Sequence, residues 1–202
     1  MTRRTLMFAA ALSAALARPG LAADMLSLSE ISAYLNGLTT AETTFTQINA
    51  DGTGSSGRVY IQRPGRMRFE YDKPDKTLVL ASGGQVAIFD DKSNQPPEQY
   101  PLSKTPLGLI LGANIDLERA RMVVGHDQEG DLTVVTAQDP DHPDYGSIAL
   151  GFAQDPLRLR QWIVTDQTGG QTTVLLDDLT VGKSYPADLF SISSEQQARN
   201  TH

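Results

Sequence analysis

The sequence contains no cysteine among its 202 residues. The chain therefore has no disulfide, no thiolate ligand for zinc, no cysteine nucleophile and no cysteine that could carry a lipid. Histidine is also scarce, with three residues, and tryptophan occurs once. Lysine and arginine together number 17 against 24 acidic residues, and this formal net charge of -7 disfavours nucleic acid as a partner.

Long hydrophobic runs are absent except at the N-terminus, where the apolar residues 6–17 follow two arginines. This run is too short for the ~20 residues that span a bilayer, and small residues follow it where a signal peptidase cleaves. We expect residues 1–22 to be a secretory signal peptide, cleaved after Ala22 or Ala23, on either the general or the twin-arginine route. Residues 23–202 then form a single exported domain.

One amphipathic helix is predicted at the start of this domain. Apolar residues recur at helical spacing from Leu28 to Leu38, and Ser27 with Glu30 has the pattern of a capping box. Further along, apolar and polar residues alternate in about ten segments that are separated by turn residues. The expected strands cover residues 43–49, 58–62, 66–71, 77–81, 86–89, 121–125, 132–137, 147–152, 157–165 and 171–179.

This order of elements predicts the fold class. A single amphipathic helix cannot cover so many consecutive strands layer by layer, as helices do in an α/β fold. We expect a mainly β domain with a few helices (α+β), in which the antiparallel strands form a strongly curved sheet or an unclosed barrel.

Between the two groups of strands, a short helix is predicted from residue 107 to residue 111. Thr105 suits an N-cap, Pro106 suits the first helical position, and Gly112 can end the helix. Apolar side chains cover most of the circumference of this helix: Leu107, Leu109, Ile110 and Leu111. Such a helix must insert into apolar surroundings, either as a plain core helix on the sheet or as a movable lid over an apolar cavity.

The clearest alternation lies in the strand from residue 66 to residue 71. Met67, Phe69 and Tyr71 fall on one face, and the charged residues between them fall on the other, as in a sheet with one apolar and one wet side. Tyr60 and Trp162 are candidates for the same aromatic wall, although ordinary core packing explains each aromatic residue taken singly. A basic stripe that binds nucleic acid is the weaker alternative.

No catalytic or metal-binding set is evident. The three histidines lie far apart in the sequence, without a nucleophile and an orienting acid beside them. The loop from Asp139 to Asp144 carries three aspartates and His142, but it lacks the spacing of an EF-hand, and a solvated acidic turn is the favoured interpretation. We therefore expect a protein that is not an enzyme and uses no cofactor and no metal.

Several short segments, none of them diagnostic alone, occur in a recognisable order. They are Phe45–Gln47, Gly57–Pro64, Arg66–Tyr71, Ser82–Val86, Thr105–Leu111 and Leu189–Phe190. Together with the export signal they resemble the periplasmic outer-membrane lipoprotein carrier family, LolA, of Gram-negative bacteria. The resemblance implies an unclosed antiparallel barrel, capped by the N-terminal helix and the lid helix, whose apolar interior takes up the acyl chains of lipoproteins.

The resemblance also implies a function, a location and partners. The chain would be a monomeric periplasmic chaperone that binds lipoproteins released from the inner membrane and carries them to the outer membrane. Its partners would be acylated lipoproteins, the inner-membrane lipoprotein-releasing ABC transporter, and an outer-membrane lipoprotein receptor where one is present. The alternative is a periplasmic regulatory module of the same fold, which senses lipoprotein and binds a membrane signalling protein.

Site residues follow from the same resemblance. It places Arg63 in a hydrogen bond to the lid region of the closed form, whereas a surface arginine beside a turn is the alternative. The acyl-chain cavity would be lined by these residues: Phe45, Met67, Phe69, Tyr71 and Trp162. Phe69 stands where the family often carries tryptophan, and residues 139–146 follow no family pattern.

Overall fold

The computed structural model describes residues 25–90, 95–105 and 107–200. The signal peptide expected at residues 1–22 lies outside this part of the chain. The elements are α1 (Leu28–Gly37), β1 (Thr40–Ile48), β2 (Gly54–Gln62), β3 (Arg66–Tyr71), β4 (Leu78–Ser82), β5 (Gln85–Phe89), β6 (Glu98–Pro101), η1 (Leu102–Lys104), α2 (Gly108–Leu111), β7 (Val123–Glu129), β8 (Leu132–Gln138), η2 (Pro143–Tyr145), β9 (Ser147–Ala153), β10 (Arg158–Thr165), β11 (Gln171–Leu176), β12 (Thr180–Val181), η3 (Ala187–Phe190) and α3 (Ile192–Asn200).

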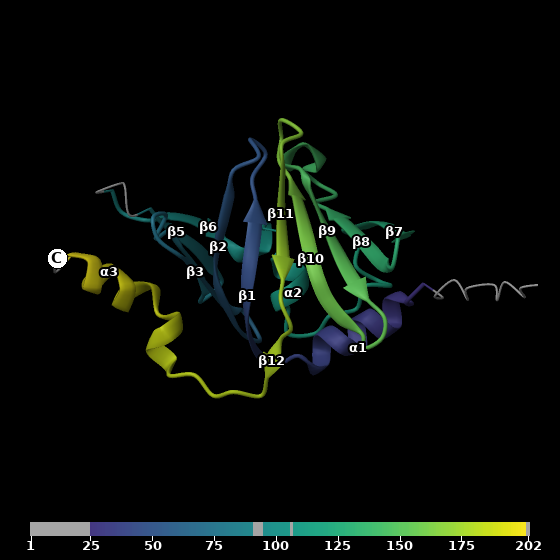
Figure 1. Cartoon of the computed structure of the whole chain (residues 1–202), viewed down its shortest axis with the longest axis horizontal. Coiled ribbons are helices and arrows are strands. Elements are labelled where there is room, and N and C mark those ends of the chain that lie inside the picture. The colour runs from purple at the N-terminus through teal and green to yellow at the C-terminus, as the bar shows by residue number, and fades with distance from the viewer. Residues whose placement is uncertain (1–24, 91–94, 106, 201–202) are drawn as a thin grey trace, which may run out of the picture.

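The described strands form one antiparallel sheet of 12 strands. The order across it is β6-β5-β4-β3-β2-β1-β11-β10-β9-β8-β7, with β12 paired to β1. Strands β6 and β7 end this order and do not pair with each other, so the sheet curves without closing (Figure 1). The predicted fold class, a mainly β unclosed antiparallel barrel with a few helices, is confirmed.

The central pair of the sheet joins distant parts of the chain. Each half of the sheet is a meander of hairpins, and the pairing of β1 with β11 connects the two halves, with Phe45 opposite Leu176. The turns between strands use glycine where the backbone requires it, as at Gly83 and Gly84, whose φ angles are 58° and 79°. Gly57 on β2 has a different role, because a Cβ there would meet the Glu70 carbonyl oxygen at 2.1 Å and the Phe45 ring at 2.9 Å.

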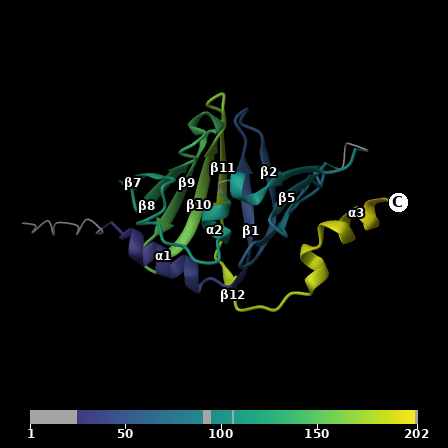
Figure 2. The same ribbon diagram turned by 180° about the vertical axis from the view of Figure 1, so that it is seen from behind.

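Helix α1 forms as its sequence predicts. Ser27 accepts a hydrogen bond from the Glu30 amide, and the Glu30 carboxylate accepts one from the Ser27 amide, which completes the capping box. Ile31 and Leu35 are fully buried in the main core cluster. Seen from behind the sheet, α1 lies below β9 and β10, and α2 lies in front of the strands (Figure 2).

The structure corrects the sequence analysis at the lid helix. Thr105 is not its N-cap: the Thr105 hydroxyl donates to the Leu102 carbonyl, because Leu102–Lys104 forms a 3₁₀ helix that Thr105 ends. Helix α2 begins at Gly108, with Leu107 in the preceding position and without a side-chain cap. Pro106 lies outside the described residues. We refer to residues 102–105 and 107–112 as the lid segment.

Two strands, one α-helix and the three short 3₁₀ helices of the described residues were not predicted. Strand β6 is exposed at all four residues, and β12 spans only two, so neither shows an alternating pattern. Helix α3 contains no fully buried residue. Together with η3 it crosses the outer side of β3 to β5, where a second apolar cluster forms around Phe190.

Candidate functional site

The inner face of the sheet carries a connected set of aromatic rings. Phe45 meets the rings of Phe69 and Tyr71 edge to face, with centroids 5.4 and 5.1 Å apart, and Phe69 meets Trp162 at 5.8 Å. Met67 is buried in the same cluster, with 1% of its surface exposed. The five residues expected to line the cavity, which come from three separated parts of the chain, therefore lie together on one apolar surface.

The lid segment covers this apolar surface. Leu109, Ile110 and Leu111 are buried in the same core cluster as the aromatic residues, and Leu107 packs against it half-buried. In this arrangement the lid side chains fill the space that a hydrophobic ligand on the inner face would need. Lid and ligand would therefore compete for the same apolar contacts.

One aromatic residue lies elsewhere than we expected. Tyr60 belongs to the outer cluster, where its ring meets that of Tyr185 at 5.7 Å. The alternation of β2 explains this, because Val59 and Ile61 point inward on either side of Tyr60. Trp162 on β10 does lie inside.

Arg63 joins the sheet to the lid segment. Its Nη2 donates to the Gly112 carbonyl oxygen at 2.5 Å and to the Asn36 Oδ1 at 3.3 Å. Burial lowers the pKa of the Arg63 guanidinium, and its Nε is buried without a hydrogen-bond partner among the described residues. The role assigned to Arg63 by resemblance, holding the lid closed, stays a prediction, although the contact that such a role requires is present.

Asn36, at the end of α1, is a junction that the sequence analysis missed. Its side chain donates to the Ile115 carbonyl oxygen at 2.8 Å and accepts from the Ile115 amide at 2.9 Å. Ser32, one turn earlier, accepts from the Leu117 amide at 3.0 Å. The chain that follows the lid is thus fixed to α1, and Arg63 contacts both sides of this junction.

Burial on the inner face shifts the acid–base equilibrium of Tyr71. Burial, together with the negative charge of Asp75, raises the pKa of the Tyr71 phenol to about 12, although the phenol donates a hydrogen bond to Gln47. Among the described residues, the buried polar side chains are those of Ser32, Thr43 and Thr133, and none of them is a carboxylate. The inner face therefore suits aliphatic chains.

The loop at residues 139–146 contains no metal site in the structure. Asp139 accepts hydrogen bonds from the amides of Asp141 and His142, and the His142 ring stacks on Tyr145 at 4.6 Å. Within the described ranges, no group of three or more histidine, aspartate or glutamate side chains is placed to hold a metal ion.

Together, the curved sheet and its covered apolar inner face define a class: unclosed antiparallel half-barrels with a helix-covered apolar interior. The family model of the outer membrane lipoprotein carrier protein LolA matches residues 36–193. The chain belongs to this family, as the sequence analysis predicted, and the family is one of carriers and not of enzymes.

Curated relatives match over nearly the whole chain. The outer-membrane lipoprotein carrier protein of Chromobacterium violaceum is 27% identical over 195 residues, covering 93% of this chain and 92% of that protein. The carrier protein of Chromohalobacter salexigens is 27% identical over 206 residues, covering 96% of each. A crystal structure of a LolA superfamily protein from Nitrosomonas europaea matches with a TM-score of 0.42 at 11% identity, covering 82% of this chain and 98% of the other. In the portion of this chain that the structure describes, no helix has the length and apolar character needed to cross a membrane.

Proposed function

We propose that this protein is a periplasmic chaperone that binds the acyl chains of lipoproteins released from the inner membrane and carries them to the outer membrane. It receives them from the lipoprotein-releasing ABC transporter and delivers them to an outer-membrane receptor where one is present. The observation that carries this proposal is the position of the lid: its three buried aliphatic side chains share one cluster with the aromatic inner face.

Loading follows from that position. An acyl chain gains ~0.8 kcal/mol for each methylene it removes from water, so it can displace the lid side chains and replace their contacts. The aliphatic lid side chains then return as the acyl chain leaves, which lowers the cost of release. Binding and release thus depend on a balance between two sets of similar apolar contacts.

Arg63 adjusts this balance. Its hydrogen bond to the Gly112 carbonyl oxygen exists in the closed form and favours that form. The buried Nε, which has no partner in the described part of the chain, limits how strongly it does so. Because the closed form is only moderately stable, the lid segment can open to admit a lipoprotein, and its return to the closed form still favours release of the lipoprotein.

Replacing Arg63 tests this function. Arg63→Leu should accept lipoprotein at least as well as the wild type and fail to hand it on, because the lid no longer returns with the same driving force. A hydrogen bond to a charged group contributes ~1.5–3 kcal/mol, which corresponds to roughly a ten- to hundredfold shift toward retained cargo. Arg63→Lys, which keeps the charge without the planar fork, should be intermediate. The measurement is a two-step transfer assay from spheroplasts to outer membranes, with the exposed Arg119 replaced by leucine as the control.

A second pair of variants tests the interior. Met67→Glu and Leu109→Glu each place a carboxylate on the apolar surface, where desolvation opposes both acyl chains and lid contacts. Lipoprotein release from spheroplasts should fall for both variants and stay normal for Val124→Glu, whose site on β7 is 58% exposed. Unchanged release by Met67→Glu and Leu109→Glu, with circular dichroism showing folded protein, would remove the proposed cavity.

A further inference from the structure

A groove of about 720 Å³ lies outside the main core, between the C-terminal arm and two hairpin turns. We define the arm as residues 187–200, which are η3 and α3. The turns connect β2 with β3, at Pro64–Arg66, and β4 with β5, at Ser82–Gly84. The volume is within the ~300–1,000 Å³ of sites that bind small ligands or short segments.

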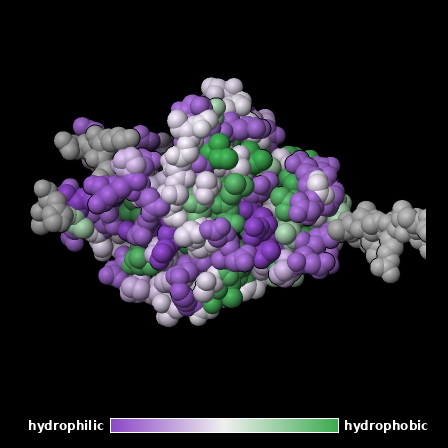
Figure 3. All heavy atoms as spheres, viewed as in Figure 1, coloured by the Kyte–Doolittle hydropathy of each residue, from purple (hydrophilic) through white to green (hydrophobic). Residues whose placement is uncertain are grey.

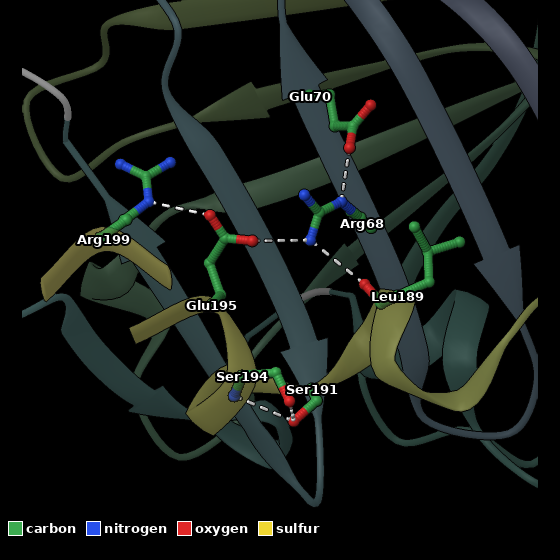
Figure 4. Close-up of polar contacts among 7 residues, drawn as sticks. All are labelled: Arg68, Glu70, Leu189, Ser191, Ser194, Glu195 and Arg199. Atoms are coloured by element: carbon green, nitrogen blue, oxygen red, sulfur yellow. Dashed lines mark hydrogen bonds and ion pairs between the residues drawn. The ribbon is translucent and has the colours of Figure 1, made fainter. Parts of the chain in front are cut away.

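The arm forms a firm wall of this groove. The Arg68 side chain, which is 13% exposed, donates to the Leu189 carbonyl oxygen and to the Glu195 carboxylate, both at 3.2 Å (Figure 4). Glu195 also accepts from Arg199, whose guanidinium lies 5.0 Å from the centre of the Phe89 ring. Phe190, which belongs to the arm, is 1% exposed and is buried in the outer apolar cluster. These contacts fix the arm on the outer side of β3 to β5, and the groove is therefore a built feature of the fold.

The opposite wall holds the lid segment through its backbone. In the first turn, the Gly65 amide donates to the Leu111 carbonyl oxygen at 2.9 Å. In the second turn, the Gly84 carbonyl oxygen accepts from the Leu102 amide at 2.8 Å. The two turns that line the groove therefore hold the beginning and the end of the lid segment, and Arg63 precedes the first of them.

From this connection we infer that the groove is a docking site for an extended, acidic segment of a partner protein, and that its occupation opens the lid. A segment wedged between the arm and the turns displaces the turns and weakens the hydrogen bonds that fix both ends of the lid. The proposal extends the proposed function, because it gives the lid a trigger other than the cargo itself.

The lining of the groove indicates this kind of occupant. Among the described residues that line the groove, Arg66 is the one charged residue, so the groove favours acidic groups over basic ones. Serine, glutamine and glycine residues supply hydrogen-bonding groups that suit a peptide backbone, and the partly buried Ile192 supplies an apolar contact for one side chain. Gln99 belongs to β6, the end strand of the sheet, where an extended segment can add.

Tethered peptides test the proposal, because a tether raises the local concentration of a weak ligand to the millimolar range. The chain has no cysteine, so Ser193→Cys in the full-length protein gives one attachment point on the groove. Two maleimide-linked peptides of equal length are attached there, Gly-Gly-Asp-Leu-Asp-Gly and Gly-Gly-Lys-Leu-Lys-Gly. Ala198→Cys is the matched control, since this site is exposed on the same helix and does not line the groove.

The measurements use no lipoprotein, so a negative result would count against the docking site without counting against the proposed carrier function. The acidic peptide on Ser193→Cys should shift the amide resonances of Gly65 and Gly84 and speed hydrogen exchange at the Leu111 and Gly112 amides about tenfold, within the range of typical allosteric coupling. The basic peptide, and either peptide on Ala198→Cys, should do neither. Absent groove shifts, or equal shifts with both peptides, would overturn the docking site. Groove shifts without faster lid exchange would overturn the coupling to the lid.

Discussion

Helix α1 and the lid segment both cover the inner face of the sheet, but they are held in different ways. Helix α1 has ten residues, a complete capping box and two fully buried side chains near its centre. Helix α2 has four residues and no side-chain cap, and the lid segment that contains it is hydrogen-bonded to two turns of the sheet and to one arginine. A ten-residue helix with its own cap has more stabilising contacts of its own than a single helical turn, which forms only when neighbouring residues hold it. This difference predicts that α1 stays in place over the inner face, whereas the lid segment can be released from it.

The surface of the protein agrees with this division. On the face seen in Figure 1, apolar residues are interrupted by hydrophilic ones in the space-filling view (Figure 3). Exposed large apolar side chains are scattered over several strands: Ile48, Tyr100, Val124, Leu175 and Val181. The extended apolar surface of the described chain lies inside, so release of the lid segment is the step that would expose it.

The largest expected difference between the two covers concerns truncation of buried side chains. Leu35→Ala in α1 should lower the free energy of unfolding by about 2–5 kcal/mol, as for other buried leucines. Ile110→Ala in α2 should lower it less, although Ile110 is equally buried, because the loss cannot exceed the free energy of closing when the open form remains folded. Urea unfolding measures both variants. Equal losses would show that the lid segment unfolds only with the whole domain.

Asn36, where the two covers meet, provides the next test. Asn36→Ala removes both hydrogen bonds to the Ile115 backbone and the contact with Arg63, which should cost about 1–3 kcal/mol. Hydrogen exchange should rise at the Ile115 and Leu117 amides and change little inside α1. The control is Asn114→Ala, an exposed residue in the same loop. Faster exchange throughout α1 would mean that α1 and the lid open as one unit.

The features that the sequence predicted correctly are those that local sequence patterns determine. Helix α1 and the inward residues of β3 depend on local patterns, a cap and an alternation, and both were predicted correctly. The misplaced N-cap at Thr105 shows the limit of such patterns, because the preceding residues Leu102–Lys104 form their own 3₁₀ turn and use the Thr105 hydroxyl. A capping residue marks a helix end only when its neighbours are not helical.

The missed features depend on contacts between distant residues. Asn36 acts on Ile115, and Arg68 on Glu195, across separations of 79 and 127 positions. Helix α3 has no buried residue, and ion pairs among Arg68, Glu195 and Arg199 help to hold it over a cluster formed by Phe190 and residues of β4 and β5. The alternation of β3 places Arg68 on the face opposite the buried residues, but it does not reveal that the arm covers this charge and supplies its partners.

Titration of Tyr71 tests whether α1 and the lid segment together exclude water from the inner face of the sheet. Burial raises the pKa of Tyr71 to about 12, so the folded protein opposes ionisation of the phenol and its stability falls as the pH rises from about 10 toward 12. Below pH 10 the phenol is neutral in both states and contributes no pH dependence. The loss should reach up to roughly 2 kcal/mol and be smaller in Tyr71→Phe, with Tyr185 contributing equally to both proteins. In Arg63→Leu, where the lid opens more readily, the pKa of Tyr71 measured by tyrosinate absorbance should move toward 10, and an unchanged value would separate Arg63 from lid closure.

The smallest expected effect concerns the cap of α1. Ser27→Ala removes the hydroxyl that accepts from the Glu30 amide, and loss of such a cap costs about 1 kcal/mol. Thermal unfolding should show the loss, with Ser103→Ala in η1, an exposed serine without a capping role, as the control. Hydrogen exchange should increase in the first turn of α1 only, because Ser32 and Asn36, which fix the chain after the lid, lie in later turns of the helix. Lid exchange should therefore remain at the wild-type rate. Faster hydrogen exchange in the lid segment of Ser27→Ala would mean that fraying at the start of α1 reaches Asn36. Helix α1 would then move together with the lid segment.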